Sequence, residues 1–362
     1  MAIDLAESIA AAGHESHLMY FKKRKTELKP DPQAVNIHHF PITQAIYRQA
    51  FGGLVDLSAR ISNAFMRKSL FILNGWAGGR AFAKKLEELE NRFGRFDKII
   101  FRGFGTFELT WSFRDDRAIY VLENIWHSYS ATRLVDRKRG ALLLHDRKLV
   151  AVSHGVKESI EKAQDTLGFT PKSIRVITNP CPVERIHRLM VEPCSDLPAE
   201  PYLLNVARLV PQKNHALLLD AYARSNAKLP LVIVGEGPLR AELEAKAAAL
   251  GIRDRVNFVG AKTNPYPWMR HAKLFVLSSR FEGLGVVLLE ALACGTPIVA
   301  VDCPGGVRDV FEGPLQCYLA ANSADALAAL IDRTLNENGY TVDPQWLNKF
   351  RPSNVVEEFV HY

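Results

Sequence analysis

Two carboxylates eight positions apart, Glu282 and Glu290, lie in the stretch SSRFEGLGVVLLEALACGTPIVAVD, which begins at Ser278. Glu282 follows an apolar run typical of a buried strand, and ligands bind at the carboxyl ends of the strands in open α/β sheets. Gly283 and Gly285 let the backbone approach a ligand closely, and the helix after them has free amides and a positive dipole end. This place suits an anion such as a phosphate.

Glu290 falls inside the apolar helix that follows. Its neighbours at helical spacing, Val286, Val287, Ala293 and Cys294, provide no polar partner for a carboxylate. Because a buried, unpaired carboxylate is strongly unfavourable, we expect Glu290 to have a hydrogen-bonding partner, and the ribose diol of a nucleotide would serve. The alternative is that Glu290 lies on the outer side of the helix.

Two further loops are expected at the same sheet edge. In NVARLVPQKNH, Arg208 closes a strand and Lys213 precedes the next helix. Two cations five residues apart on such a loop can converge on a diphosphate, the arginine through its fork and the lysine as a point charge. The loop VGEGP, which contains Gly235 and Glu236, also joins a strand to a helix.

The elements that must position these residues are short apolar runs alternating with helical patterns. In the second half the predicted strands are YLLNVAR, LPLVIVG, RVNFVG, KLFVLSS and TPIVAVD, and the predicted helices are HALLLDAYARS, PLRAELEAKAAALG and VVLLEALACG. In the first half the predicted strands are FDKIIFR, AIYVLEN, KLVAVSH and SIRVITNP. This alternation predicts βαβ units on parallel sheets, and therefore two doubly wound α/β domains.

Two regions depart from that alternation. The stretch from Glu184 to Pro201 contains Pro193 and Pro198 without a strand or helix period, and is predicted to be a linker. The chain opens directly in a helix, ended by Gly13, and then enters a strand. A doubly wound domain normally begins with a strand and a glycine turn, so the first strand of this domain is expected to be missing from the chain or replaced.

Taken together, ARLVPQKN, VGEGP, RVNFVG, SSRFEGLGVVLLEALACGTPIVAVD and the glycine pair after it resemble the nucleotide-binding half of the family-four retaining glycosyltransferases. The NPYPWM and DCP motifs resemble members that act in bacterial lipopolysaccharide and surface polysaccharide synthesis. The resemblance implies a GT-B fold, with two Rossmann-like domains facing a cleft. The implied organisation is an acceptor-side domain at 1–185, a linker at 186–200, a donor-binding domain at 201–345, and a C-terminal helix at 346–362 that crosses back to the first domain.

The resemblance also implies roles for the residues named above. Glu282 would lie against the donor sugar, Glu290 would hold the ribose, and Arg208 and Lys213 would neutralise the leaving diphosphate. The remaining donor contacts would come from Gly283, Leu284, Gly285, Gly235 and Glu236. No metal and no separate cofactor are expected, because cations and a helix end replace the metal and the nucleotide-diphosphate sugar is the donor substrate.

The acceptor side is less clearly marked. Where the family often has a histidine after the strand here written IYVLEN, this chain has Glu123, with His127 four residues further on. Glu123 and His127 are therefore the predicted acceptor residues, although His127 also fits an ordinary loop position.

Composition is that of a soluble enzyme, with 48% apolar and 23% charged residues and a formal charge of +7. The N-terminus lacks the pattern of a signal peptide, no window suggests a membrane span, and the five cysteines fit neither disulfide pairing nor zinc spacing, so we expect a cytoplasmic protein. Basic runs begin at Phe21 and Arg133, and residues 47–73 mix apolar with basic residues. They fit either a solvated face and a core helix, or attachment to anionic lipid on the inner face of the membrane.

We therefore predict a metal-independent, peripheral membrane enzyme that transfers a sugar from a nucleotide-diphosphate donor to a lipopolysaccharide or other surface glycan acceptor, with retention of anomeric configuration. Its partners would be the nucleotide sugar, a glycolipid or oligosaccharide and the anionic inner-membrane surface, and not nucleic acid. The alternatives are a nucleotide-sugar epimerase of the same fold and a non-catalytic donor-binding subunit of a polysaccharide assembly complex.

Overall fold

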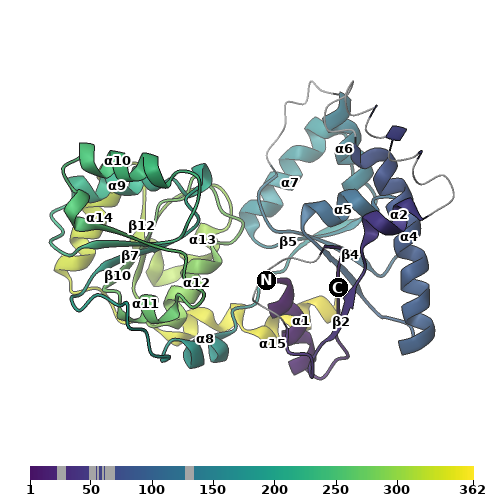
Figure 1. Cartoon of the computed structure of the whole chain (residues 1–362), viewed down its shortest axis with the longest axis horizontal. Helices are drawn as coiled ribbons and strands as arrows, with labels where there is room; N and C mark the ends of the chain where they lie inside the picture. The colour runs from purple at the N-terminus through teal and green to yellow at the C-terminus, as the bar shows by residue number, and fades with distance from the viewer. Residues whose placement is uncertain (23–29, 49–53, 55–56, 59–60, 62–69, 127–133) are drawn as a thin grey trace. The chain divides into compact units, whose positions relative to one another are not determined.

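The computed structural model describes residues 1–22, 30–48, 54, 57–58, 61, 70–126 and 134–362. The chain divides into two compact units (Figure 1). One comprises residues 1–178 and 355–362, and the other comprises residues 179–354.

The second unit is built on a six-stranded parallel sheet. Its strands are β7 (Leu203–Val206), β8 (Leu231–Val234), β9 (Val256–Gly260), β10 (Leu274–Leu277), β11 (Ile298–Val301) and β12 (Leu319–Ala320). Each of the five strands predicted in this half is confirmed. The spatial order is β9-β8-β7-β10-β11-β12, so the winding direction reverses between the neighbours β7 and β10.

Helices cover both faces of this sheet (Figure 1). They are α8 (Val183–Leu189), α9 (His215–Arg224), α10 (Arg240–Ala249), α11 (Tyr266–His271), α12 (Val286–Ala293), α13 (Val307–Val310) and α14 (Ala324–Asn336), with 3-10 turns η1 (Pro211–Lys213), η2 (Arg253–Arg255), η3 (Gly313–Tyr318) and η4 (Pro344–Phe350). α9, α10 and α14 lie on one face, and α11 and α12 lie on the other.

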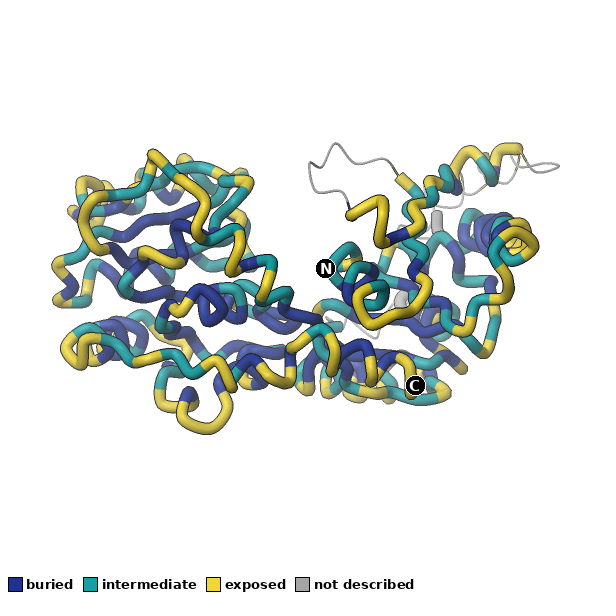
Figure 2. Tube along the Cα trace, turned by 90° about the horizontal axis from the view of Figure 1, so that it is seen from below, coloured by how far each residue is buried: buried dark blue, intermediate teal, exposed yellow. Residues whose placement is uncertain are grey.

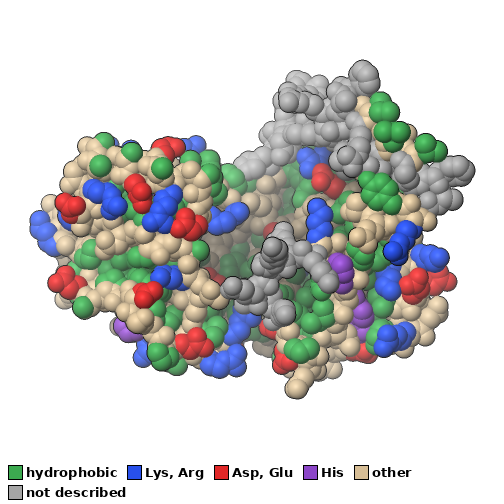
Figure 3. All heavy atoms as spheres, viewed as in Figure 1, with side chains coloured by type: hydrophobic (Ala, Val, Ile, Leu, Met, Phe, Trp, Pro, Cys, Tyr) green, Lys and Arg blue, Asp and Glu red, His purple; other side chains and the backbone are tan. Residues whose placement is uncertain are grey.

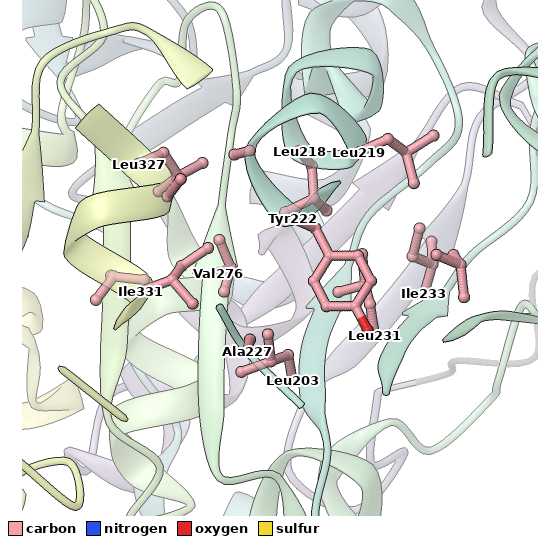
Figure 4. Close-up of a cluster of buried hydrophobic side chains, with 14 of the residues drawn as sticks. Leu203, Leu218, Leu219, Tyr222, Ala227, Leu231, Ile233, Val276, Leu327 and Ile331 are labelled. Carbon is pink, nitrogen blue, oxygen red and sulfur yellow. The ribbon is translucent and has the colours of Figure 1, made fainter. Parts of the chain in front are cut away.

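The core of the second unit lies between the sheet and α9, α10 and α14. Leu218 and Tyr222 of α9 meet Ile331 of α14 and strand residues such as Leu203 and Val276, all fully buried (Figure 4). Strands buried on both faces read as continuous apolar runs, which is why the sequence revealed them so clearly.

The first unit contains a four-stranded parallel sheet in the order β3-β4-β5-β6 and a parallel pair β1-β2. The strands are β1 (His17–Tyr20), β2 (Asn36–His39), β3 (Ile99–Arg102), β4 (Ala118–Leu122), β5 (Lys148–Ala151) and β6 (Ser173–Val176). The helices are α1 (Ala2–Ala11), α2 (Ile42–Tyr47), α4 (Leu70–Phe93), α5 (Phe104–Thr110), α6 (Leu134–Leu144), α7 (His154–Leu167) and α15 (Pro352–Val360). The four strands predicted in this half are β3 to β6, and β4 is buried along its whole length.

Two of the predicted boundaries need correction. The stretch taken as a linker contains α8, because Ile186 is fully buried and the His187 ring lies 3.0 Å from the carbonyl oxygen of Ala293. The predicted C-terminal helix is two elements: residues 344–350 form the 3-10 turn η4, and α15 begins only at Pro352. Proline lacks the N–H that an unbroken helix would need there, but it is well suited to a helix start.

Buried residues follow the strands and the inner helix faces in each unit (Figure 2). On the face drawn in Figure 3, Lys and Arg are intermixed with Asp and Glu over the second unit and do not gather into one basic patch. Among the helices of the described residues, none combines the length and the apolar character needed to cross a bilayer.

Candidate active site

The candidate active site lies where the loops after β7 and β10 meet at the carboxyl edge of the second unit's sheet. These strands are neighbours, but the helices that follow them, α9 and α12, pack on opposite faces. The chain therefore turns toward opposite faces after these two strands, and such a switch point is the usual ligand position in a doubly wound sheet. Lys213 from the first loop and Glu282 from the second lie here, with Nζ 2.5 Å from Oε1.

Glu282 is held by two donors on the same carboxylate oxygen. The Ser279 hydroxyl, which is fully buried, donates to Oε1 over 2.6 Å, and Lys213 donates to that oxygen as well. The Glu282 side chain is only 7% exposed. Both donors bind Oε1, and Oε2 has no hydrogen-bond partner among the described residues, so that oxygen can accept a hydrogen bond from a ligand.

Backbone contacts clamp the two loops together. The Ser278 hydroxyl donates to the carbonyl oxygen of Lys213 over 3.0 Å, and the Arg280 amide donates to the carbonyl of Gln212 over 2.8 Å. In return, the Gln212 side-chain amide donates to the carbonyl of Phe281 over 3.1 Å. These bonds fix the carboxylate and the ammonium before any ligand arrives, which is what preorganisation requires.

The loop after β11 contributes through a glycine. Gly305 forms an isolated parallel bridge with Glu282, and its φ is +110°. A Cβ on Gly305 would lie 1.6 Å from the carbonyl oxygen of Glu282, a distance that no side chain tolerates. Cys303 lies nearby, and burial together with the charges of Glu282 and Asp302 raises the pKa of its thiol to about 12. The thiol is therefore protonated at neutral pH and is not a nucleophile.

Gly283, Leu284 and Gly285 link Glu282 to α12, as predicted, and all three are buried. Gly285 precedes the helix with a φ of +81°, which favours glycine. The first amides of a helix lack partners within it, and the positive end of the helix dipole lies beside them. In α12 the Leu288 amide already donates to the carbonyl of Gly285 over 2.8 Å, which leaves the amides before it for a ligand. An anion is the ligand that this helix end favours.

Glu290, on α12, is half-buried and has a partner that the sequence did not reveal. The Tyr266 hydroxyl, from α11, donates to Glu290 Oε1 over 3.3 Å. The expected hydrogen-bonding partner of Glu290 is therefore present within the protein, because α11 packs on α12 and provides a donor, and contact with a ribose stays a prediction. The Cys294 thiol lies near this carboxylate. Its own burial and the charge of Glu290 raise the pKa of the thiol to about 12.

Arg208 differs from Lys213 in that its side chain has no partner among the described residues. It follows β7 and is exposed, and only its backbone carbonyl is bonded, accepting from the Val210 amide over 2.9 Å. Lys213, by contrast, is already bound to Glu282. Of the two cations expected to bind a diphosphate, Lys213 is therefore already paired with Glu282, whereas the Arg208 side chain has no partner among the described residues.

The VGEGP loop packs directly on the Arg208 loop. The Leu209 amide donates to the carbonyl of Glu236 over 2.9 Å, and a Cβ on Gly235 would lie 1.9 Å from the carbonyl oxygen of Ala207. The Glu236 side chain is exposed and pairs with Arg240 over 2.5 Å. Gly235 and Glu236 thus lie at the predicted edge, and Gly235 is there because the neighbouring backbone leaves no room for a side chain.

His215 also lies next to this site, and the sequence analysis did not select it. It begins α9, is 1% exposed, and neither ring nitrogen has a hydrogen-bond partner among the described residues. Burial, reinforced by the charge of Lys213, lowers the pKa of His215 to about 4. The ring is therefore neutral under physiological conditions.

The predicted acceptor residues belong to the first unit. Glu123 follows β4 and forms a two-armed ion pair with Arg102, at 2.9 Å from Nε and 2.7 Å from Nη2. It lines a pocket of about 510 Å³. His127 lies outside the described residues.

The predicted site was incomplete in two places. Ser279 and Tyr266, which hold the two glutamates, were not selected from the sequence. Ser279 lies three residues before Glu282, a spacing that allows a loop hydroxyl to reach the carboxylate, whereas Tyr266 is 24 positions from Glu290 and only the fold brings it there. Within the described part of the chain, no group of three or more His, Cys, Asp or Glu side chains is arranged to hold a metal ion.

Comparisons with known proteins show what the second unit and the whole fold are similar to. Residues 196–345 match the family described as glycosyl transferases group 1. A Campylobacter jejuni protein named N-acetylgalactosamine-N,N'-diacetylbacillosaminyl-diphospho-undecaprenol 4-alpha-N-acetylgalactosaminyltransferase is 36% identical over 155 residues, covering 43% of this chain and 42% of that protein. The lipopolysaccharide 1,6-galactosyltransferase of Salmonella typhimurium is 29% identical over 167 residues, 45% of each chain.

Both matches span less than half of the relative's length. A solved structure of Anabaena HepE in complex with UDP and glucose covers 99% of this chain and 93% of its own, at 19% identity and a TM-score of 0.71. That likeness extends over both units and confirms the predicted fold class. The chain thus has the GT-B fold of two Rossmann-like halves, and residues 196–345 within it match the glycosyl transferases group 1 family.

Proposed function

We propose that this protein is a glycosyltransferase that moves a sugar from a nucleotide-diphosphate donor to a lipopolysaccharide or other surface glycan acceptor, with retention of anomeric configuration. The observation that carries the proposal is the Ser279–Glu282–Lys213 cluster at the switch point of the donor-side sheet. The family match of this unit and the relatives named for lipopolysaccharide and lipid-linked glycan synthesis support the substrate class.

Each group has a proposed part in the transfer. The diphosphate binds Arg208 and the first-turn amides of α12, and Lys213 adds a positive charge close to the leaving oxygen. Glu282 accepts a hydrogen bond from a hydroxyl of the donor sugar through Oε2, and Glu290 accepts one from the ribose. No metal or cofactor takes part in this proposal.

The proposed reaction needs no reactant other than the donor and the acceptor. The bond between the anomeric carbon and the diphosphate oxygen breaks, and its electron pair leaves with the diphosphate. The acceptor hydroxyl forms the new bond on the same face of the sugar, and its proton passes to the departing phosphate oxygen. Stabilising the charge on that diphosphate is therefore the main task of the protein.

Product analysis tests this function directly. The protein is incubated with a panel of nucleotide sugars and lipid-linked or oligosaccharide acceptors, and the anomeric proton coupling of the product is read by NMR. Retention requires donor and product to have the same anomeric configuration, and an inverted product would refute that part of the proposal. An epimerase would convert the nucleotide sugar without any acceptor, and a non-catalytic subunit would bind it without turnover.

We also propose attachment to an anionic membrane surface on the cytoplasmic side. Of the two basic runs and the 47–73 segment, most residues lie outside the described part of the chain. Leu54, Leu57 and Ile61 of that segment are 54% to 60% exposed and Tyr47 is 43% exposed, whereas Ile72 and Leu73 at the start of α4 are half-buried. Exposed apolar side chains beside a basic sequence favour a membrane-facing segment over a core helix.

Vesicle flotation tests the attachment. Because surface charges are screened over about 10 Å at 0.1 M salt, binding to anionic vesicles should fall steeply as salt rises. Equal flotation with neutral and anionic vesicles, or flotation with neither, would mean that the basic runs are only a solvated face.

A further inference from the structure

The first unit contains a pocket of about 510 Å³ at the carboxyl ends of β3 and β4. It is lined by Gly103 and Phe104 after β3, by residues 121–126 at the end of β4, and by Arg139 of α6. The volume lies within the range of about 300 to 1,000 Å³ that small-ligand pockets occupy. The side chains around it combine an aromatic wall with charges that are already paired.

The aromatic wall is formed by Phe104 and Trp126. Their ring centres are 4.8 Å apart, and Phe104 also contacts Phe107, at 5.6 Å. The Trp126 backbone amide donates to the Ser159 hydroxyl of α7 over 2.9 Å, which ties the backbone of this residue to a helix. Rings held in this way present a rigid apolar surface at little entropic cost, and such a surface suits the flat face of a ring-shaped ligand.

The charged side chains of the pocket are neutralised by partners outside its lining. Glu123 pairs with Arg102, which is 8% exposed, and Arg139 pairs with Glu108 of α5. Among the described residues, these two cations and two anions balance each other in charge. A phosphate or carboxylate group needs cations that are not already neutralised, so this pocket does not favour an anionic ligand.

The same charged side chains can still form hydrogen bonds with the hydroxyl groups of a ligand. The two bonds that Arg102 donates to Glu123 both end on Oε1, and Oε2 has no partner among the described residues. The Glu123 side chain is 36% exposed, so this oxygen can accept from a ligand. The Arg139 guanidinium lies 5.0 Å from the Phe104 ring centre and brings hydrogen-bond donors to the edge of the aromatic wall.

We infer that this pocket binds an uncharged sugar ring of the acceptor, with its apolar face on Phe104 and Trp126 and its hydroxyls on Glu123 and Arg139. The inference rests on the proposed function and adds the chemical class of the acceptor group. A diphosphate or an acidic sugar of the same glycolipid binds elsewhere. Trp126 and Glu123 are then specificity-determining residues of the acceptor site.

Saturation-transfer NMR on the full chain tests this inference with the methyl glycosides of glucose, galactose, N-acetylglucosamine and N-acetylgalactosamine. At least one glycoside should give ring-proton signals in the wild type, and Trp126→Ala should reduce its affinity by about tenfold or more, the equivalent of 1.4 kcal/mol. The matched control is Trp76→Ala, which removes a 38% exposed indole from α4 in the same unit and should leave the signals unchanged.

The charge argument has its own test. Inorganic pyrophosphate should not displace the glycoside from the wild-type protein. Glu123→Gln should weaken glycoside binding and make the remaining signal sensitive to pyrophosphate, because Arg102 and Arg139 then outnumber the nearby carboxylates. Glu123→Asp keeps the charge and should stay insensitive, and a thermal unfolding curve for each variant confirms that it is folded.

The inference is overturned if no glycoside gives a signal that depends on Trp126, or if pyrophosphate displaces the glycoside from the wild type. A parallel titration with nucleoside diphosphates separates this result from the proposed function. Nucleotide binding without glycoside binding would remove the acceptor inference and leave the donor site standing. Glycoside binding without nucleotide binding would leave the sugar-binding pocket standing and remove the donor site.

Discussion

Ser279→Ala tests whether the geometry of Glu282 governs turnover. The variant removes a fully buried hydroxyl that donates to Glu282 Oε1 over 2.6 Å, and leaves the Lys213 contact in place. A hydrogen bond to a charged group contributes about 1.5 to 3 kcal/mol. If that energy holds the carboxylate in its working position, kcat should fall by about 10- to 150-fold, at 1.4 kcal/mol per tenfold.

Ser278→Ala is the matched control. This serine is the neighbouring residue and is equally buried, but its hydroxyl donates to the uncharged carbonyl of Lys213 over 3.0 Å. Such a bond contributes about 0.5 to 1.5 kcal/mol. We expect a smaller loss of stability and of kcat than in Ser279→Ala, as measured by urea unfolding and by donor turnover with acceptor in excess.

The donor KM separates positioning from binding. Ser279→Ala should leave it within about threefold of the wild-type value, because the hydroxyl contacts the carboxylate and not the donor. Equal losses of kcat in the two serine variants, or a loss confined to KM, would refute the claim that Ser279 acts by orienting a charged Glu282.

Three further predictions follow from the same contacts. Gly305→Ala should lower the free energy of unfolding by about 1 to 3 kcal/mol or more and reduce turnover, because its Cβ would overlap the Glu282 carbonyl; unchanged urea unfolding would contradict this. The pKa of His215 is about 4 in the folded protein, against an ordinary value of 6.5. On acidification the unfolded chain therefore binds a proton at a higher pH than the folded protein does. The free energy of unfolding should fall by up to about 3 kcal/mol between pH 6.5 and pH 4. His215→Phe should flatten that slope in pH-dependent unfolding, and an unaltered slope would exclude His215 as its origin. Tyr266→Phe should raise the donor KM about 2- to 12-fold with little change in kcat, as should Glu290→Gln, whereas a loss confined to kcat would argue against ribose binding.

The strands that are buried on both faces of the sheet could be predicted from the sequence. Strands β8, β10 and β11 are buried along their whole length, and each appears as a continuous apolar run. In β7 only Asn205 interrupts the run, and its side-chain amide donates to the carbonyl of Val276. Because the carboxyl ends of parallel strands lie at one edge of a sheet, the loops that contain Arg208, Glu236 and Glu282 could be assigned to one edge from the sequence alone. Short elements next to prolines were harder: α8 has only seven residues, and its burial depends on α12.

Side-chain pairings within the site were beyond the sequence. The distance along the chain between Lys213 and Glu282 is 69 residues, and only the adjacency of β7 and β10 brings them together. For the same reason Lys213 was assigned to phosphate alone, although Glu282 already holds it. Tyr266 was missed because its contact requires α11 to pack on α12, and no local pattern records that packing.

Calorimetric titration with the diphosphates of uridine, guanosine, adenosine and thymidine tests the central claim most directly. At least one should bind the wild type, and Arg208→Ala should weaken it about 10- to 150-fold, the range for a hydrogen bond to a charged group. Arg224→Ala is the control, because this arginine is 53% exposed at the end of α9 and pairs with Asp325 at the surface. Binding that Arg208→Ala leaves unchanged, or no binding of any nucleotide, would contradict a donor site at this sheet edge.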